Sequence, residues 1–259
     1  MPDLPALDVL LPLGVRRLEP LAGEPELIGL FTADVPAGVH VRANMVSSVD
    51  GAAAGADGQS GSINGSADWR VFRVLRALAD VVLIGAGTAR AEGYTALSVP
   101  DDLRAARATL GRPDALELAV VTTGDLPDAL LDGDRPPLVL TTGANPQLSA
   151  LRARIGADRV IVTADSGHVD ARAAVAALAD RGLTHVLAEG GPGLLAQLVD
   201  ADVVDELCLT WSPQLVGGPV GRITNLPSWF APPRALRPLH LLHADGVLLG
   251  RWRVARLGA

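Results

Sequence analysis

The sequence predicts an α/β fold of three layers, with helices on both faces of a mostly parallel sheet and an antiparallel hairpin at its C-terminal edge. Three observations support this class. Between residues 66 and 199, short apolar runs alternate with helical stretches, as is typical of βαβ units. The apolar runs after residue 203 follow one another without an intervening helix. Hydrophobic residues make up 49% of the 259 residues, which suffices for one substantial core.

The N-terminal part lacks a clear pattern, so we divide the chain into an extension, residues 1–37, and a single domain, residues 38–259. The extension is rich in Pro, Leu and Gly, and we expect it to form loops or one short helix. The first strand is expected at 39–46. The glycine-rich segment 52–65 is interpreted as a mobile loop that could shape a ligand cleft.

Regular elements follow this loop. The segment 66–79 carries a helical apolar stripe and leads directly into a strand. We expect strands at 81–84, 118–122, 138–141, 159–162 and 184–188, helices at 146–155, 169–181 and 194–199, and final strands at 204–210, 236–243 and 247–254. The stretch His243-Ala-Asp-Gly246 is expected to form the turn of the closing hairpin.

The charge distribution argues against several classes of function. A net charge of −7, scattered along the chain, offers no basic face to a phosphate backbone, so we expect no nucleic-acid partner. No apolar run approaches membrane-spanning length and the first 20 residues lack a secretory pattern, so we expect a cytoplasmic protein without a membrane segment. All 22 basic residues are Arg, which excludes a Schiff-base lysine and a Walker-type phosphate loop.

Metal and disulfide chemistry is also not expected. Cys208 is the only cysteine, so no disulfide can form within the chain. Its apolar neighbours indicate a buried small hydrophobe. The five histidines are dispersed without the spacing of metal ligands, and we expect no metal site.

Two glycine-rich segments come directly after predicted strands, Gly85-Ala-Gly-Thr88 and Glu189-Gly-Gly-Pro-Gly193. Glycine lets the main chain approach a pyrophosphate closely, and the first amides of a following helix favour an anion. Ligands of open α/β sheets bind beyond the carboxyl ends of the strands. Neither segment is a full G-x-G-x-x-G, but together they predict one dinucleotide site on which both converge.

Longer motifs, in their order and spacing, resemble one enzyme family. They are Asn44-Met-Val-Ser-Ser-Val-Asp-Gly51, Leu75-Arg-Ala-Leu-Ala-Asp-Val-Val-Leu-Ile-Gly-Ala-Gly-Thr88, Glu189-Gly-Gly-Pro-Gly-Leu-Leu195, Val204-Asp-Glu-Leu207 and Pro213-Gln-Leu-Val-Gly-Gly218. From about Val39 to the C-terminus, the chain resembles the pyrimidine reductases of riboflavin biosynthesis.

The resemblance implies a fold, a reaction and an assembly. The fold is dihydrofolate-reductase-like, and the enzyme is a homodimer. NADPH is the cofactor that reduces the ribosyl chain of 5-amino-6-(5-phosphoribosylamino)uracil. We expect a stand-alone reductase, because the length and the lone cysteine leave no room for the zinc deaminase domain that precedes it in many members.

The resemblance also implies roles for individual residues. The substrate-binding residues are Asn44, Ser60, Asn64, Arg76 and Glu189, and Glu189 is also the candidate catalytic group. The cofactor-binding residues are Val46, Ser62, Gly85, Gly87, Thr88, Glu92, Gly190, Gly191, Pro192, Gly193, Leu194 and Leu195. Thr122 and Thr123 could reach a 2′-phosphate with their hydroxyls, although no Arg is evidently placed to read that group.

Simpler structural roles stay open for some of these residues. Glu189 could only cap or orient the helix that follows it. Arg70, Arg73 and Arg76 could form a solvated helix face. Asp50, followed by Gly, could be a turn former and nothing more.

The stretch after Thr88 departs from the family pattern. The usual Asp-Asp-Pro, and the Arg that follows it to bind the substrate phosphate, are replaced by Glu92-Gly-Tyr94 and the uncharged Val99. Two alternatives therefore stay open: an NADPH-dependent reductase of dihydrofolate or another pteridine-type heterocycle, and a catalytically inactive NADPH-binding protein.

Overall fold

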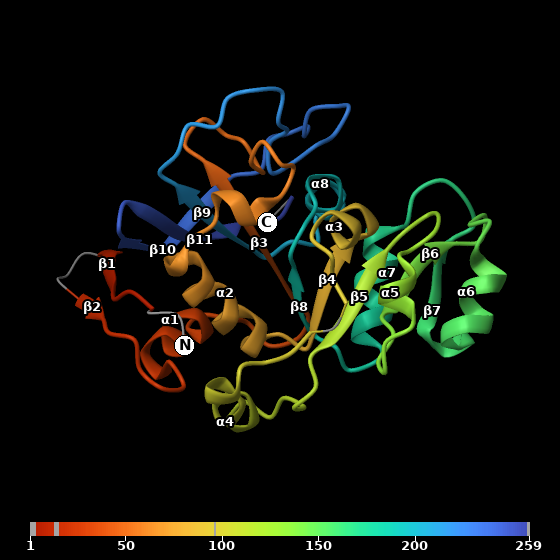
Figure 1. Ribbon diagram of the computed structural model, residues 1–259, viewed down its shortest axis with the longest axis horizontal. Helices are drawn as coiled ribbons and strands as arrows, with labels where there is room; N and C mark the ends of the chain where they lie inside the picture. Colours follow the sequence, from red (N-terminus) through yellow and green to blue (C-terminus); the bar gives the residue numbers. More distant parts are fainter. Residues whose placement is uncertain (1–3, 13–15, 96, 258–259) are drawn as a thin grey trace.

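Within residues 4–12, 16–95 and 97–257, which the computed structural model describes, one sheet of eleven strands runs through the molecule (Figure 1). Its strands are β1 (Leu7–Leu11), β2 (Arg16–Leu18), β3 (His40–Ser48), β4 (Val81–Gly85), β5 (Glu117–Val121), β6 (Leu138–Thr142), β7 (Val160–Ala164), β8 (His185–Ala188), β9 (Glu206–Ser212), β10 (Leu236–Ala244) and β11 (Val247–Val254). Their order across the sheet is β2-β1-β10-β11-β9-β3-β8-β4-β5-β6-β7.

The helices connect and cover these strands. They are α1 (Pro25–Thr32), α2 (Ser66–Leu78), α3 (Ala86–Ala91), α4 (Asp101–Thr109), α5 (Asp128–Leu131), α6 (Leu148–Ile155), α7 (Ala171–Ala179) and α8 (Pro192–Asp200), with the short 3₁₀ helices η1 (Ser60–Ile63) and η2 (Ala157–Arg159). Helices α3, α4 and α5 were not predicted. All three helices are short, and α4 is also strongly charged, so none of them has a long apolar stripe.

The expected mostly parallel sheet with an antiparallel edge is confirmed. From β9 to β7 all neighbouring strands pair in parallel, whereas β9, β11, β10, β1 and β2 pair antiparallel. The antiparallel edge is wider than the predicted hairpin, because β1 adds to β10 and β2 adds to β1. The expectation of loops or one short helix before residue 38 is therefore wrong for β1 and β2, although α1 is the short helix. These two strands are too short to show a clear alternation.

Two hydrophobic cores lie on opposite faces of the sheet, which gives the three layers. Along β4, Val82 and Ile84 pack in the core beneath α2, whereas Val81 and Leu83 pack in the core beneath α7 and α8. Side chains of a strand point alternately to its two faces, so a strand buried on both sides reads as a continuous apolar run. Figure 1 shows how these helices lie about the sheet.

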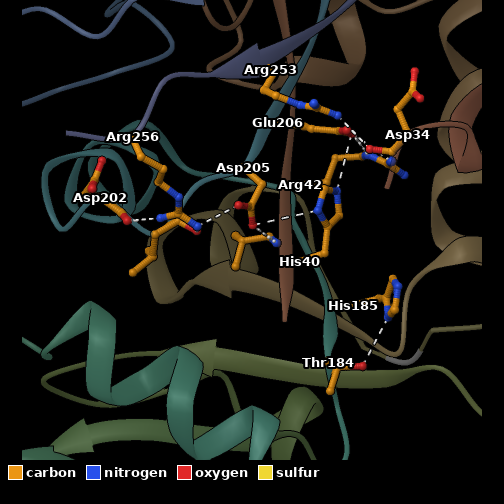
Figure 2. A network of polar contacts seen from close by, with 12 residues as sticks. Asp34, His40, Arg42, Thr184, His185, Asp202, Asp205, Glu206, Arg253 and Arg256 are labelled. Carbon is orange, nitrogen blue, oxygen red and sulfur yellow. Dashed lines mark hydrogen bonds and ion pairs between the residues drawn. The ribbon is translucent and has the colours of Figure 1, made fainter. Parts of the chain in front are cut away.

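A buried ion cluster joins β3, β9 and β11 to the end of α1, and Figure 2 shows three of its members, His40, Arg42 and Glu206. Glu206 is fully buried and accepts hydrogen bonds from Arg42 Nε at 2.9 Å and from Arg251 Nη2 at 2.6 Å. The same two guanidinium groups donate to the carbonyls of Phe31 and Leu30, each at 2.8 Å, and so satisfy the last turn of α1. Burial alone would raise the pKa of Glu206, but hydrogen bonds from His40 and Arg251 and the charge of Arg42 outweigh it and hold that pKa well below its usual range.

We expect Glu206→Gln to lower the free energy of unfolding by about 3 kcal/mol or more at pH 7, because it leaves two buried Arg charges uncompensated. The depressed folded-state pKa means that this contribution is present above the unfolded pKa of about 4.3 and is lost as the pH falls further. Urea unfolding measures the change. Glu26→Gln is the control, since its pair with Arg16 is exposed and contributes less than about 1 kcal/mol. Equal losses in the two variants would contradict the prediction.

Candidate functional site

The two glycine-rich segments lie in contact, as expected. In the parallel pairing of β4 with β8, Leu83 lies opposite Ala188, the last residue of β8, and β4 continues two residues further to Gly85. The Gly85 amide then donates to the Gly190 carbonyl at 2.9 Å. The carboxyl ends of β3, β4, β5 and β8 therefore open onto one edge of the sheet.

Three adjoining cavities follow this edge. The inner, middle and outer cavities have volumes of about 360, 510 and 370 Å³. The inner and middle cavities share Met45, Ala53, Ser60, Thr88, Glu92 and Glu189 in their walls. The middle and outer cavities share Gly85, Gly87, Gly193 and Leu194. The three cavities thus form one continuous groove.

The inner cavity is polar at its base and aromatic along its side. It collects the sequence-predicted residues Asn44, Val46, Ser60, Asn64, Arg76, Thr88, Glu92 and Glu189. Its aromatic wall consists of Trp69, Phe72 and Tyr94, none of which was singled out in the sequence. Aromatic faces and nearby donors and acceptors suit a flat heterocyclic ring.

The charged centre of the inner cavity is the pair of Arg76 and Glu189. Arg76 Nε and Nη2 donate to the two carboxylate oxygens of Glu189, each at 2.7 Å, and the Tyr94 hydroxyl donates to Oε2 at 2.7 Å. The Arg76 guanidinium also stacks 4.2 Å from the centre of the Phe72 ring. Burial raises the pKa of Tyr94, so this hydroxyl keeps its proton and remains a donor. The pair is therefore fixed in position before any ligand binds.

Both simpler readings of these charged residues are wrong. Helix α8 begins at Pro192 and has no side-chain cap at Gly191, so Glu189 is not its cap. The row of arginines on α2 is not solvated either. Arg70 and Arg73 are 1% and 5% exposed and form ion pairs with Glu24 and Asp102.

The middle cavity has bare backbone in its wall, at Gly85, Gly87, Gly191 and Gly193. A Cβ on Gly191 would stand 2.8 Å from Thr88 Oγ1, and the adjoining Gly190, just outside the wall, has a φ of +92°, which side-chain-bearing residues rarely adopt. At Gly87 and Gly193 nothing lies within 4 Å of the position of a Cβ, so any side chain there would project into open space. Such a cradle, at the start of a helix, fits a diphosphate that needs close approach to main-chain amides.

The outer cavity contains Thr122 and Thr123 together with Arg90 and His168. The Arg90 Nη1 atom donates to the Asp125 carbonyl at 3.4 Å, which holds the guanidinium over the loop after β5. The expectation that no Arg is placed beside the two threonines is therefore wrong. Arg90 was missed because it lies on α3, a helix that the sequence pattern did not reveal.

Three predicted residues lie outside the walls of these cavities: Ser62, Gly190 and Leu195. The Ser62 hydroxyl instead donates to Asp57 Oδ1 at 2.9 Å. Gly190 contributes through its backbone bond to Gly85. Leu195 is 1% exposed and packs in the core under α8, because consecutive residues of a helix point about 100° apart and Leu194 is the one that faces the groove.

Asp68 is the main site residue that the sequence did not reveal. It is 3% exposed, borders the inner cavity, and accepts a hydrogen bond from the Thr210 hydroxyl. Burial raises its pKa to about 6, although the hydrogen bond from Thr210 opposes this. The sequence does contain a signal for this role of Asp68. Asp68, Phe72 and Arg76 are spaced four residues apart and so lie on one face of α2.

Asp50 does more than form a turn. Its carboxylate accepts hydrogen bonds from the Ser48 hydroxyl and from the Gly217 amide at 2.7 Å. These bonds lower the pKa of Asp50 to about 2. Asp50 thereby attaches the loop after β9 to the end of β3, and this loop continues to Val220 and Gly221 in the wall of the middle cavity.

The remaining expectations about composition concern thiols, metals and membranes. Cys208 is buried as expected, and burial raises the pKa of its thiol to about 12. Among residues 4–12, 16–95 and 97–257, no three His, Cys, Asp or Glu side chains gather closely enough to hold a metal ion. In that same part of the chain, no helix combines the length and the hydropathy of a membrane span.

The fold and the groove define an α/β protein with a ligand site at the carboxyl ends of parallel strands. Residues 39–242 match the family model described as the RibD C-terminal domain, and the chain belongs to this family. It is similar to 2,5-diamino-6-ribosylamino-4(3H)-pyrimidinone 5′-phosphate reductase of Archaeoglobus fulgidus, with 24% identity over 69% of this chain and 82% of that protein. It is also 29% identical, over 72% of its length, to the riboflavin biosynthesis protein RibD of Mycobacterium tuberculosis, of which the match spans 46%.

Solved structures confirm the expected α/β fold of RibD-type reductases. A pyrimidine reductase-like protein from Corynebacterium diphtheriae matches with a TM-score of 0.72 and 25% identity, over 89% of this chain and 99% of that one. The riboflavin biosynthesis reductase Rib7 of Saccharomyces cerevisiae has the same fold, with a TM-score of 0.55 and 15% identity over 88% of this chain and 95% of that one.

We expect Gly190→Ala to lower the free energy of unfolding by about 1–2 kcal/mol, because a Cβ is unfavourable at positive φ and would meet Met45 Sδ at 3.1 Å. Gly193→Ala is the matched control in the same segment. It lies in α8 with nothing within 4 Å of the added Cβ, and we expect no loss of stability. Thermal unfolding of the two variants measures the difference, and an equal change in both would contradict the conformational requirement at Gly190.

Proposed function

We propose that this protein is an NADPH-dependent oxidoreductase that reduces a pyrimidine-type heterocyclic substrate. The observation that carries the proposal is the continuous groove, in which a glycine-lined half adjoins a polar and aromatic pocket. A redox cofactor and its substrate must bind side by side, and the groove has one compartment of suitable chemistry for each. The printed names of the relatives, which are reductases, support the same class.

In this proposal the middle and outer cavities hold the cofactor. Gly85, Gly87 and Thr88 face one side of it, and the segment from Gly191 to Leu194 faces the other. Val46 and Glu92 border the junction with the inner cavity, and Ser62, Gly190 and Leu195 support the surrounding loops and helix. When bound, reduced nicotinamide supplies the hydride for the reaction.

The inner cavity holds the substrate in this proposal. Glu189 accepts hydrogen bonds from ring N–H groups, while Asn44, Ser60 and Asn64 supply donors and acceptors around it. Arg76 orients the carboxylate of Glu189 through two hydrogen bonds. Replacing Glu189 with Gln should therefore weaken substrate binding and turnover, and undiminished turnover at saturating cofactor would remove Glu189 from the reaction.

The relatives' names favour a ribosylaminopyrimidine phosphate as the substrate, of the type of 5-amino-6-(5-phosphoribosylamino)uracil. A specific observation favours a second candidate, a non-phosphorylated heterocycle such as a dihydropteridine. Of the residues in the walls of the inner cavity, three are carboxylic, Asp68, Glu92 and Glu189, and one is cationic, Arg76. Arg76 is already paired with Glu189, so these walls offer no free cation to a phosphate.

The deciding experiment measures binding and oxidation of the cofactor separately. NADPH is titrated by fluorescence, and its oxidation is then followed by absorbance with the ribosylaminouracil phosphate, its dephosphorylated form and dihydrofolate. Oxidation with one of these compounds supports the reductase and identifies the substrate class. Binding without oxidation by any of them would indicate the inactive NADPH-binding protein, and absence of binding would overturn the proposal.

We expect Arg90→Gln to weaken NADPH binding about tenfold and to leave NADH binding unchanged, because its guanidinium, beside Thr122 and Thr123, would pair with the 2′-phosphate that only NADPH carries. A tenfold loss corresponds to about 1.4 kcal/mol. Fluorescence titration with both nucleotides makes the comparison. Arg104→Gln, an exposed change on α4, is the control for loss of charge. Equal weakening of both nucleotides would show that Arg90 does not read the 2′-phosphate.

We also propose a homodimeric, cytoplasmic enzyme, as the family resemblance implies. The segment between β9 and β10 presents Leu215 and Trp229 at 80% and 87% exposure, and large exposed apolar side chains favour association. Light scattering coupled to size-exclusion chromatography measures the assembly.

A further inference from the structure

Asp68 occupies an unusual position for a carboxylic acid. Asp68 lies in the first turn of α2 and is 3% exposed, yet it forms part of the wall of the inner cavity. One oxygen accepts a hydrogen bond from Thr210 on β9, and no Arg forms an ion pair with it in the described part of the chain. A buried carboxyl without a cationic partner is more stable in its neutral, protonated form than an exposed one.

The other two acids of the cavity, Glu189 and Glu92, accept strong hydrogen bonds from neighbouring groups. Glu189 accepts three hydrogen bonds from Arg76 and Tyr94, each at 2.7 Å. Glu92 Oε1 accepts from the amide and the hydroxyl of Ser60 at 2.8 and 2.9 Å. Asp68, in contrast to Glu189, is buried without a cationic partner, and this favours its protonated form, so it is the acid of this cavity best suited to donate a proton.

We propose that Asp68 is the proton donor of the reduction, an inference that rests on the proposed reductase function. The carbon of a C=N bond in the substrate accepts the hydride that the cofactor supplies. The π electron pair of that bond forms a new N–H bond with the proton of Asp68, while the O–H bond of Asp68 breaks and leaves a carboxylate. Water then returns a proton to Asp68. The reaction requires a reducible C=N bond in the substrate. Both candidate substrates contain one, because a ring-opened ribosylamine and a dihydropteridine each have such a bond.

The surroundings of Asp68 determine the pH dependence. Across the cavity lie the ionised pair of Glu189 and Arg76 and the neutral Tyr94 hydroxyl, and the charge of Glu189 disfavours a second negative charge. On β9, Thr210 and the neutral Cys208 thiol face α2, and the charges of Arg42, Glu206 and Arg251 lie beyond Cys208. Burial and Glu189 together raise the pKa of Asp68 to about 6, close to the working pH of a general acid.

The first test compares Asp68→Asn with the wild type under saturating cofactor and substrate. A lost general acid lowers kcat about 100-fold, whereas KM and the NADPH dissociation constant should stay within about twofold. Wild-type kcat should fall tenfold per pH unit above about pH 6, since the donor must be protonated, and this dependence should disappear in D68N. Asp101→Asn, an equal charge change on exposed α4, should leave the profile unchanged. If D68N had the same kcat and the same pH profile as the wild type, the proposal would be overturned.

Thr210→Val provides a second test that keeps the carboxyl in place. Loss of the Thr210 hydrogen bond, which lowers the pKa of Asp68, should move the fall in kcat to higher pH without abolishing it. Carbon-13 NMR of Asp-labelled, ligand-free protein should contain a carboxyl resonance that titrates near pH 6 and is missing from D68N. If no carboxyl titrates above pH 5, the assignment falls. If the wild type binds no reduced nicotinamide, the proposed function fails as well, whereas equal turnover by wild type and D68N removes only the role of Asp68.

Discussion

The site depends on one constraint of the sheet, the insertion of β8 between β3 and β4 with all three strands parallel. In this register Ala43 and Leu83 both lie level with Ala188. Strand β8 ends at this level, whereas β3 continues through Asn44 and β4 continues to Gly85, so Asn44, Glu189 and Gly85 all follow this level within two residues. The Glu189 amide donates to the Leu83 carbonyl at 3.1 Å, so the alignment continues past the end of β8. A slip of one residue in β8 would turn Glu189 to the opposite face and separate it from Arg76.

Helix α2 is the second support of the site, and buried arginines fix it in place. Arg70 pairs with Glu24 and donates to the carbonyls of Leu18 and Glu19 at 2.8 Å, so the N-terminal segment braces the helix from outside. Arg76, on the same helix, holds Glu189. A chain whose basic residues are all Arg is suited to this use, because the planar guanidinium donates several hydrogen bonds in fixed directions and cannot lose its charge in a protein.

Much of the fold was predictable, because strands buried on both faces form apolar runs and helices on a parallel sheet show a clear period. The meeting of the two glycine segments also followed from parallel strand ends. The pairing of Arg76 with Glu189 could not be derived from spacing, since 113 residues separate them, and the family resemblance implied only that each of the two contacts the substrate. Strands β1 and β2 are too short to show the alternation of apolar and polar residues that predicts a strand. Asp68 was not predicted because the apolar stripe of α2 gives a stronger sequence signal than the polar face beside it. The burial that raises the pKa of Asp68 arises only when β9 packs against α2.

The charge balance of the inner cavity connects its structure to its chemistry. Arg76 neutralises Glu189, so the walls present one compensated ion pair and, at Asp68, one acid that burial favours in its neutral form. In a buried site, an uncompensated carboxylate beside Glu189 is costly, and this cost raises the pKa of Asp68 to about 6. A substrate with a free phosphate would add negative charge where no unpaired cation stands in the wall. A neutral ring with N–H groups would instead pair with Glu189 and leave the proton of Asp68 available for transfer.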